Sequence, residues 1–588
     1  MNLNALTCTD SYKLGHAVMY VDGTTKVYSN LTPRSDKIYR RNCTQFYDGK
    51  IVVLGVQGAV QEIKEMWQES FFSQPKEKVL AKYKRRLDGH LGPDAITINH
   101  IAELHDIGYL PIQVKCLPEG SVVNPGIPIM TVTNTVPNAF WLVNYLETVL
   151  SNLIWKPCTN ATIAREYKAI CKHYADITGT DDFSVSIQCH EFAERGMSGP
   201  EDSARAGFGH LTQFIGTDTL PAMDYAEDYY DANPDGLIAI SVPATEHAVA
   251  TSNILYKERD IAVDVGENDP NLRLIAEQEF MRDLITRKFP TGIVSYVADS
   301  FDFWAVLTDI LPNLKDVIMA REASHVAPGK LVIRPDSGDP VRVICGDTFR
   351  SADDVVTAAE LIVERVREET PHGECGVGQD SEVFLIGGKY IEVGVDIEWN
   401  RYDKQYYYED GYDYHIINED VQLSAEQKGA IQVLWEIFGG TVTDKGYKLL
   451  DSHIGLIYGD SITTKRAEEI LRRLAEKGFA SGNVGFGVGS YTYQCNTRDT
   501  AGMAVKATYT EVNGEGIEIF KDPKTDSKKK SAKGLLFVGK NSEGFFLKDC
   551  ASKEEEASSE NYLQTIFKDG QWVKRVTLEE IRNRLSQS

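Results

Sequence analysis

Residues 333–340 read Ile-Arg-Pro-Asp-Ser-Gly-Asp-Pro, and they follow the run Lys330-Leu331-Val332. The run predicts a short buried strand, because apolar residues bounded by turn signals are typical of one. A planar guanidinium beside a flexible turn suits a phosphate or a flat polar ring. The carboxylates suit ribose hydroxyls or a cation. Because ligands of α/β proteins bind at strand ends, the stretch indicates either a ligand site or a plain Pro/Asp/Gly turn.

Two further stretches repeat this arrangement. Gly216-Thr217-Asp218-Thr219 follows the apolar run at 211–215, and Ser241 to His247 follows the run at 237–240. Strand-like runs that each end in a polar cluster are typical of an α/β barrel, which gathers its strand ends around one mouth. From about residue 180 to 500 the pattern alternates strand, polar turn and helix, which predicts mostly parallel strands with covering helices. We expect further strands at 293–297, 317–319 and 454–458, and helices at 301–310 and 465–477. Before this region we expect helices within 51–70 and 138–176, and strands at 112–115 and 129–132.

The bulk properties exclude several classes of protein. A net charge of −24 over 588 residues argues against a general nucleic-acid binder, which needs a basic surface. It leaves room for a local basic pocket. No apolar stretch is long enough to cross a membrane, and the first residues lack the pattern of a secretory signal. The ten cysteines include no Cys-x-x-Cys pair, which favours reduced thiols and a cytoplasmic location.

Several blocks, in this order along the chain, resemble the nicotinate phosphoribosyltransferase-like family of type II phosphoribosyltransferases. They are Thr9 to Lys13, Lys26 to Ser29, Leu117 to Gly120, Gly216 to Thr219, Ser241 to His247, Asp299 to Asp302, Ile333 to Gly338 and Phe520 to Pro523. The resemblance implies an irregular α/β barrel, expected at 151–499, beside a β-rich domain built from both chain ends, expected at 1–150 and 500–588. Residues 372–446 would be an insertion in the barrel. This insertion is either a folded surface elaboration or a regulatory or partner-binding unit.

The resemblance also implies an activity. A member of this family with these residues would be a pentosyltransferase of NAD salvage. It would use nicotinamide and phosphoribosyl pyrophosphate to make nicotinamide mononucleotide and pyrophosphate. Mg²⁺ would accompany phosphoribosyl pyrophosphate, ATP would stimulate the reaction, and the enzyme would be a homodimer with shared active sites. The alternatives are a nicotinate-specific enzyme and a catalytically silent homologue that binds nucleotides or partners.

For the nicotinamide ring, the resemblance points to Phe192, Arg195, Asp218 and Ser295, and to Tyr12 from the other subunit. Two aromatic faces can sandwich a pyridine ring. The family usually reads Asp-Phe-Gly-Tyr-Arg-Gly where this chain has Glu-Phe-Ala-Glu-Arg-Gly at 191–196. Asp218 is the most informative of these residues, because a carboxylate accepts hydrogen bonds from a carboxamide and repels a ring carboxylate. Its alternative role is a helix N-cap.

For catalysis the resemblance points to His247, Asp336 and Arg334, with His247 accepting a phosphate from ATP. A lone histidine is more often structural, and either Glu246 or Asp299 would orient it as a nucleophile. The turn Gly487-Val488-Gly489-Ser490 can direct backbone N–H groups at a phosphate. The sequence assigns no metal ligands. The phosphate- and ribose-binding residues that the resemblance implies are Arg34, Ser241, Asp299, Arg334, Asp460, Gly489, Ser490, Arg498, Lys506 and Lys521.

Overall fold

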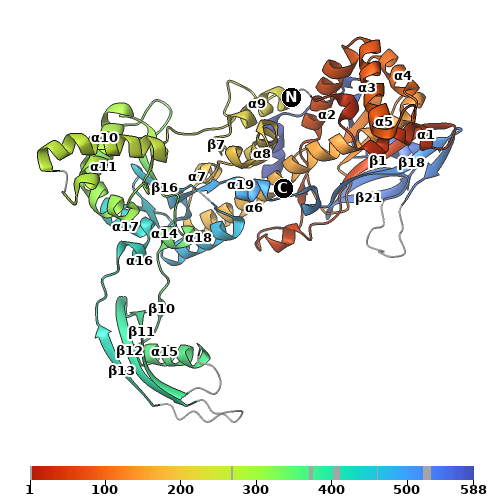
Figure 1. The fold of residues 1–588 in the computed structure, drawn as a ribbon. Helices are drawn as coiled ribbons and strands as arrows, with labels where there is room; N and C mark the ends of the chain where they lie inside the picture. Colours follow the sequence, from red (N-terminus) through yellow and green to blue (C-terminus); the bar gives the residue numbers. More distant parts are fainter. Residues whose placement is uncertain are drawn as a thin grey trace.

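The computed structural model describes residues 3–266, 269–369, 375–400, 411–459, 461–520 and 532–587. The chain forms a parallel α/β barrel, a strand-rich domain and a projecting arm (Figure 1). The barrel carries the predicted site residues that follow strands, so its strand order is described first.

The barrel sheet has the order β7-β6-β17-β16-β9-β8, and all its ladders are parallel. Single bridges from Gly216 to Ile240 and from Ala244 to Ser295 join the two outer strands through the segment 240–244. The ring therefore closes through an irregular segment instead of a full strand. The strands are β6 (Cys189–Glu191), β7 (Gly216–Thr217), β8 (Ile293–Val297), β9 (Lys330–Arg334), β16 (Ile454–Tyr458) and β17 (Val484–Val488).

Three strand predictions in the barrel are confirmed and three are wrong. The strands expected at 293–297, at 331–333 and at 454–458 are β8, β9 and β16. At 237–240 only Ile240 makes a bridge, since Pro243 downstream has no N–H to extend a ladder. Residues 211–215 connect a helix to β7 and form no strand of their own. Residues 317–319 lie in α13 (Leu311–Met319), which buries Leu311, Leu314 and Ile318 at helical spacing.

Helices cover the barrel. The helix predicted at 465–477 is α18 (Thr464–Glu476), and the one predicted at 301–310 begins as α12 (Phe303–Ala305) and continues as a π turn (Val306–Ile310). The remaining helices around the barrel are α7 (Asp182–Ile187), α8 (Pro200–Leu211), α9 (Leu220–Tyr230), α10 (His247–Val265), α11 (Leu272–Asp283), α14 (Pro340–Cys345), α16 (Ala425–Lys428), α17 (Ala430–Phe438) and α19 (Ser490–Gln494). A short ladder pairs β14 (Gly440–Val442) with β15 (Lys448–Leu450).

The strand-rich domain draws on both ends of the chain, as predicted. Its sheet has the order β19-β18-β1-β5-β3-β22-β23, and the strands expected at 112–115 and 129–132 are β3 and β5. The strands are β1 (Thr24–Pro33), β3 (Ile112–Cys116), β5 (Met130–Asn134), β18 (Met503–Val512), β19 (Glu515–Glu518), β22 (Gln564–Lys568) and β23 (Gln571–Trp572). Beside the sheet lie the pair β2 (Ile51–Val52) and β4 (Val122–Val123), the hairpin β20 (Leu535–Asn541) and β21 (Gly544–Ala551), and the helices α1 (His16–Met19), α2 (Val56–Trp67), α3 (Lys76–Leu91), α4 (Asn99–Ile107), α5 (Phe140–Tyr145), α20 (Lys553–Ala557) and α21 (Leu578–Ser586).

One long helix, α6 (Glu147–Thr178), belongs to both domains. Its residues Leu150, Ile154 and Cys158 are buried in the core of the strand-rich domain, whereas Tyr167 and Ile170 are buried in the core of the barrel. The domain boundary expected at residue 150 therefore falls within a shared helix. This helix fixes the barrel relative to the sheet.

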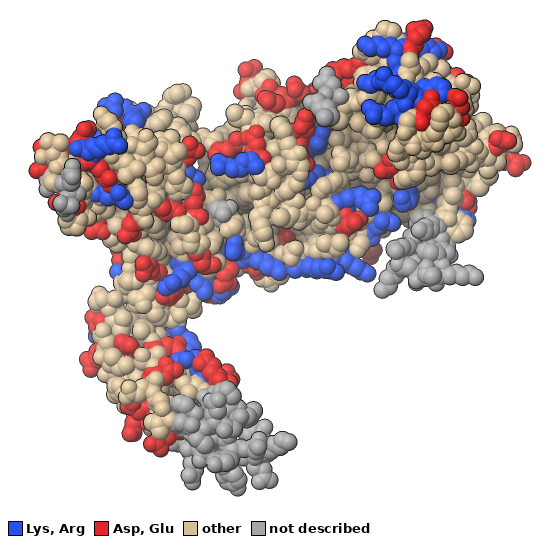
Figure 2. Space-filling model, viewed as in Figure 1, with Lys and Arg blue, Asp and Glu red and all other residues tan. Residues whose placement is uncertain are grey.

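The arm begins and ends earlier than the insertion expected at 372–446. It consists of β10 (Arg350–Ser351), α15 (Val355–Glu369), β11 (Cys375–Ile386), β12 (Lys389–Asn400) and β13 (Gly411–Asn418), and it projects from the barrel (Figure 1). Its core includes Ile362, Phe384 and Val393, and it is separate from the core of the barrel. After the arm the chain forms two helices, α16 and α17, and α17 returns to the barrel core. Figure 2 shows acidic side chains on the arm and a group of Lys and Arg over α3.

Candidate functional site

Arg334 ends β9 at the carboxyl edge of the barrel and joins two predicted site carboxylates. Its Nη1 lies 3.2 Å from Oδ2 of Asp336, and its Nη2 donates to the carbonyl of Thr245 at 2.6 Å. The backbone N–H of Asp336 donates to Oδ2 of Asp299 at 3.0 Å. Arg334, Asp336 and Asp299 thus form one hydrogen-bonded group, although they come from the ends of two strands.

His247 is the first residue of α10 and lies beside this group. Its Nδ1 is 3.0 Å from the hydroxyl of Ser300, and its Nε2 is 3.8 Å from carboxylate oxygens of both Asp299 and Asp336. Glu246, the other acid expected to orient His247, is exposed at the N-cap of α10. The imidazole is 49% exposed, so a phosphate donor can reach it.

A second group surrounds Asp218, directly after β7. Oδ1 of Asp218 accepts a hydrogen bond from the hydroxyl of Ser241 and lies 2.9 Å from Nε2 of His190. Burial alone would raise the pKa of the Asp218 carboxyl, but the hydrogen bonds from His190 and Ser241 outweigh burial and lower the pKa below its usual value. Asp218 is therefore an ionised carboxylate at neutral pH. Its helix N-cap alternative fails, because Thr219 precedes α9 and no side chain caps that helix.

Of the predicted ring residues, Phe192 is linked to Asp218 through His190. The ring of Phe192 is 4.7 Å from the ring of His190, with the planes 36° apart. Ser295 is buried on β8, and Arg195 is exposed in the turn after Phe192. A Cβ placed on Gly196 would lie 2.0 Å from the Ser490 hydroxyl, so the turn after Phe192 touches the turn after β17.

The turn after β16 also reaches the first group. A Cβ placed on Gly459 would lie 1.9 Å from Oδ1 of Asp336, so only a glycine allows this approach without a shift of the carboxylate. Gly489 and Ser490 begin α19 directly after β17. The ends of β6, β7, β8, β9, β16 and β17 therefore gather the barrel residues at one mouth.

Three polar atoms at this mouth are buried without a partner. Within the part of the chain that the structure describes, Oγ of Ser295, Oδ1 of Asp299 and Nε of Arg334 have no hydrogen-bond partner. Buried polar groups are normally paired, so unpaired ones in a functional cluster call for a ligand or water.

Other predicted residues make their contacts outside these two groups in the same chain. Tyr12 is 64% exposed in the turn before α1, and Nζ of Lys506 on β18 lies 3.3 Å from Glu147. Nε of Arg34 donates to the carbonyl of Gly502 at 3.1 Å, and Arg498 pairs with Asp499. Figure 1 shows α1, β1 and β18 on the opposite side of the molecule from α10 and β16. Asp460 and Lys521 lie outside the described residues.

The sequence reasoning missed His190, Ser300 and Thr245. His190 and Ser300 each stand within two residues of a predicted site residue, and that proximity was the available signal. Thr245 contributes a backbone carbonyl to Arg334, which no side-chain pattern reveals.

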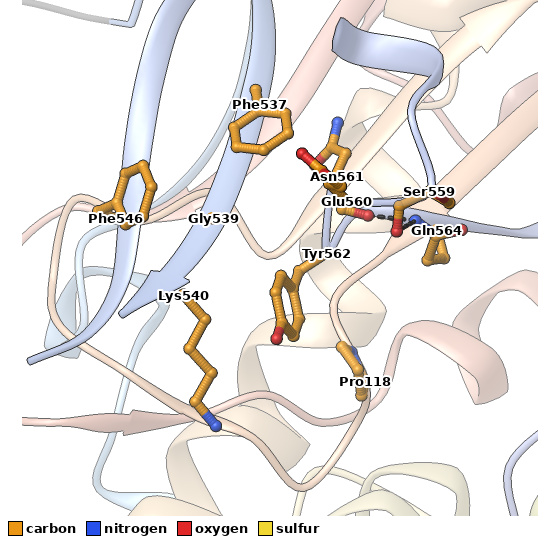
Figure 3. A pocket seen from close by; sticks show the side chains of 10 residues that line it. All are labelled: Pro118, Phe537, Gly539, Lys540, Phe546, Ser559, Glu560, Asn561, Tyr562 and Gln564. Carbon is orange, nitrogen blue, oxygen red and sulfur yellow. Dashed lines mark hydrogen bonds between the residues drawn. The ribbon is translucent and has the colours of Figure 1, made fainter. Parts of the chain in front are cut away.

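The described residues enclose two large cavities in addition to the groups around Arg334 and Asp218. One of about 700 Å³ is lined by Glu166, Ser461, Arg466 and Tyr491, beside the turns after β16 and β17. The other, of about 550 Å³, lies by the β20–β21 hairpin (Figure 3), where Phe546 and Tyr562 flank Lys540. No predicted site residue lines the second cavity.

The described residues contain neither a cluster of metal ligands nor a helix that could span a membrane. Among them, no three His, Cys, Asp or Glu side chains are grouped to hold a metal ion. No helix in the same residues is both long and apolar enough to cross a membrane.

Known proteins resemble this chain over most of its length. Residues 187–366 and 401–571 match the nicotinate phosphoribosyltransferase (NAPRTase) family. The chain is 44% identical to the nicotinamide phosphoribosyltransferase of Acinetobacter baylyi over 587 residues, which are 100% of this chain and 97% of that protein. It is 29% identical to the protein of the same name from Mycoplasma pneumoniae, over 91% of this chain and 95% of that one. Among solved structures, human nicotinic acid phosphoribosyltransferase aligns with a TM-score of 0.45 and 16% identity, over 99% of this chain and 93% of that one.

Proposed function

Because the chain belongs to the nicotinate phosphoribosyltransferase family, we propose that it is a nicotinamide phosphoribosyltransferase of NAD salvage. It transfers the phosphoribosyl group of phosphoribosyl pyrophosphate to the ring nitrogen of nicotinamide. The products are nicotinamide mononucleotide and pyrophosphate. The observation that carries the choice of nicotinamide is the ionised carboxylate of Asp218, held by His190, whose ring lies against Phe192.

The physical reason is a difference between two ring substituents. Oδ1 of Asp218 is held by Ser241 and His190, so Oδ2 is the oxygen available to the substrate. A carboxamide can donate an N–H to that oxygen. A ring carboxylate would bring a second negative charge to a half-buried site, which costs free energy.

At the sugar, the residues supply charge and position. Pyrophosphate leaves with negative charge, and Arg334 offers a guanidinium to that side of the mouth. The ribose carbon that is attacked becomes cationic. The carboxylates of Asp299 and Asp336, which are grouped with Arg334, would stabilise that positive charge. The Phe192 ring holds the pyridine in line, which lowers the entropy cost of the reaction.

Mg²⁺ with phosphoribosyl pyrophosphate fits this arrangement. Mg²⁺ in such sites binds one or two carboxylates and substrate phosphates. Oδ1 of Asp299 is buried and has no hydrogen-bond partner among the described residues, and Asp336 lies next to Asp299, so these two side chains would hold the ion. When bound, the ion would neutralise charge on the leaving pyrophosphate.

ATP stimulation would act through His247. The imidazole is half exposed, and the Ser300 hydroxyl and the buried carboxylate of Asp299 fix its orientation. An imidazole held in this way can accept a phosphoryl group.

A homodimer would complete the site. Tyr12 lies just before α1 and Lys506 lies on β18, and Figure 1 shows both elements on the opposite side of the molecule from α10 and β16. A partner that presents its α1 and β18 side to the mouth would supply an aromatic face and cations.

The cysteines that the structure describes are all free, which supports a cytoplasmic enzyme.

The test is release of pyrophosphate by the purified protein with nicotinamide, phosphoribosyl pyrophosphate and Mg²⁺. We expect turnover that requires nicotinamide and that falls at least a hundredfold, about 2.7 kcal/mol of transition-state stabilisation, in Arg334→Ala. Turnover that is the same in Arg334→Ala would assign the activity to a contaminant. Absence of turnover in the wild-type protein would contradict the proposal.

A further inference from the structure

His190 connects the two parts of the ring site. It lies on β6, while Asp218 follows β7 and Ser241 lies in the segment that closes the barrel. These elements are adjacent, because His190 pairs with Gly216 and Gly216 bridges to Ile240. Nε2 of His190 is 2.9 Å from Oδ1 of Asp218, and its ring lies against Phe192.

The place of the imidazole is fixed by its surroundings. Only 13% of its side chain is exposed. A Cβ placed on Gly216 would lie 2.8 Å from Nδ1 of His190, so the glycine gives the ring its room. Packing therefore restricts the ring to the orientation that points Nε2 at Asp218.

The neighbouring groups leave Nε2 of His190 free to donate to Asp218. Asp218 is an ionised acceptor, so the proton belongs on Nε2. The other titratable groups that act on His190 are Glu191 and His210. Glu191 accepts hydrogen bonds from Thr217 and from the Ala193 N–H, and Nε2 of His210 meets the Cys189 carbonyl. Neither competes for Nε2 of His190.

We propose that His190 is a positioning residue that holds Oδ1 of Asp218, so that Oδ2 faces the substrate carboxamide and selects amide over acid. This inference rests on the proposed function and adds a residue to it. His190 and Ser241 together occupy Oδ1, which leaves one oxygen and one direction for the substrate. Loss of the His190 donor would let the carboxylate turn, and both the affinity for the amide and the rejection of the acid would fall.

A matched pair of variants separates the donor from the ring. His190→Phe keeps a flat ring against Phe192 and removes the donor, while His190→Gln removes the ring and keeps an N–H at a similar reach. We expect His190→Phe to raise the KM for nicotinamide roughly ten- to a hundredfold, as for loss of a hydrogen bond to a charged group. The KM for phosphoribosyl pyrophosphate should change little, and the acid-to-amide ratio of kcat/KM should rise. His190→Gln should restore most of the selection.

An equal rise of both KM values in His190→Phe, with an unchanged acid-to-amide ratio, would overturn the inference and assign His190 to packing alone. A second measurement needs no activity. In ¹⁵N spectra of the full-length protein, the His190 ring should carry its proton on Nε2, and Asp218→Ala should shift the population toward Nδ1–H. An Nε2 without a proton in the wild-type protein would overturn the inference even if the enzyme is active. An inactive wild-type protein with the expected tautomer would contradict the proposed function instead.

Discussion

At the scale of a single residue, the surroundings of His247 suit the proposed phosphate acceptor, a role separate from the transfer itself. In the proposed mechanism the transfer relies on Arg334, the carboxylates of Asp299 and Asp336 and the Phe192 ring, none of which needs a histidine base. We therefore expect His247→Ala to abolish labelling by γ-phosphate-labelled ATP and to weaken nucleotide formation without eliminating it. The label on the wild-type protein should be acid-labile and base-stable, as a phosphoramidate is.

Glu246→Gln is the matched control, because Glu246 is exposed and adjacent in sequence. It should keep the label. A label that persists in His247→Ala would place the phosphate on another residue.

His210 predicts a pH dependence of stability. It is buried between Phe214 and Tyr493, with Nδ1 2.7 Å from the Tyr493 hydroxyl and Nε2 3.2 Å from the Cys189 carbonyl. Burial lowers the pKa of His210 to about 3. Below its unfolded pKa of about 6.5, the unfolded chain takes up a proton that the folded chain does not. The contribution is therefore fully present above pH 6.5 and is lost as the pH falls toward 3.

From pH 7 to pH 5 the loss amounts to about 2 kcal/mol. His210→Gln does not titrate, so it should be less stable than the wild-type protein at pH 7 by a margin that narrows at pH 5. Thermal unfolding of both proteins at the two pH values measures this margin. An unchanged margin would mean that His210 does not titrate on unfolding.

At the scale of elements, the sequence predicts the strands whose ends carry chemistry. β8, β9 and β16 are five-residue strands built around short apolar runs and bounded by turns. Those runs were the signal that predicted them. The runs at 211–215 and 317–319 are also apolar, but helices α8 and α13 extend to them, and short apolar runs do not distinguish buried helix from strand. The segment 237–240 closes the barrel by single bridges, which depend on neighbours that are distant in sequence.

The same limit applies to the site. Arg334, Asp336, Asp299, His247, Asp218 and Ser241 were found because they follow strand-like runs or match family blocks, and the structure brings them to one mouth. The pairing of His190 with Asp218 needs the adjacency of β6 and β7, which local pattern does not give. The proposed role of Tyr12 needs a second chain, so the geometry within this chain does not test it.

No described residue of the arm belongs to the predicted site. Its core is separate from that of the barrel, and its two ends meet where the Asp347 N–H donates to the Gln427 carbonyl at 2.9 Å. We expect replacement of residues 349–423 by a short Gly/Ser linker to leave kcat/KM for nicotinamide within about twofold, as for a surface insertion with adjacent ends. Thermal unfolding should confirm that the barrel remains folded. A folded but inactive product would show that the arm takes part in catalysis.

At the scale of the whole molecule, the proposed dimer explains why predicted site residues lie on opposite sides of one chain (Figure 1). Mixing inactive Tyr12→Ala subunits with inactive Arg334→Ala subunits should restore activity, because each mixed dimer contains one site with both groups intact. Subunit exchange must be shown separately, for example with differently tagged chains. If exchange occurs and no activity returns, the sites are not shared.

Competition between nicotinamide and nicotinic acid is the most direct test of the central claim. Equal concentrations of both are given to the enzyme with limiting phosphoribosyl pyrophosphate, and the two mononucleotides are separated and counted. The account predicts that nicotinamide mononucleotide dominates in the wild-type protein. It also predicts that the ratio moves toward the acid product by about 1–3 kcal/mol, roughly five- to 150-fold, in Asp218→Asn or Asp218→Ser. A wild-type enzyme that prefers nicotinic acid, or a ratio that is unchanged in both variants, would contradict it.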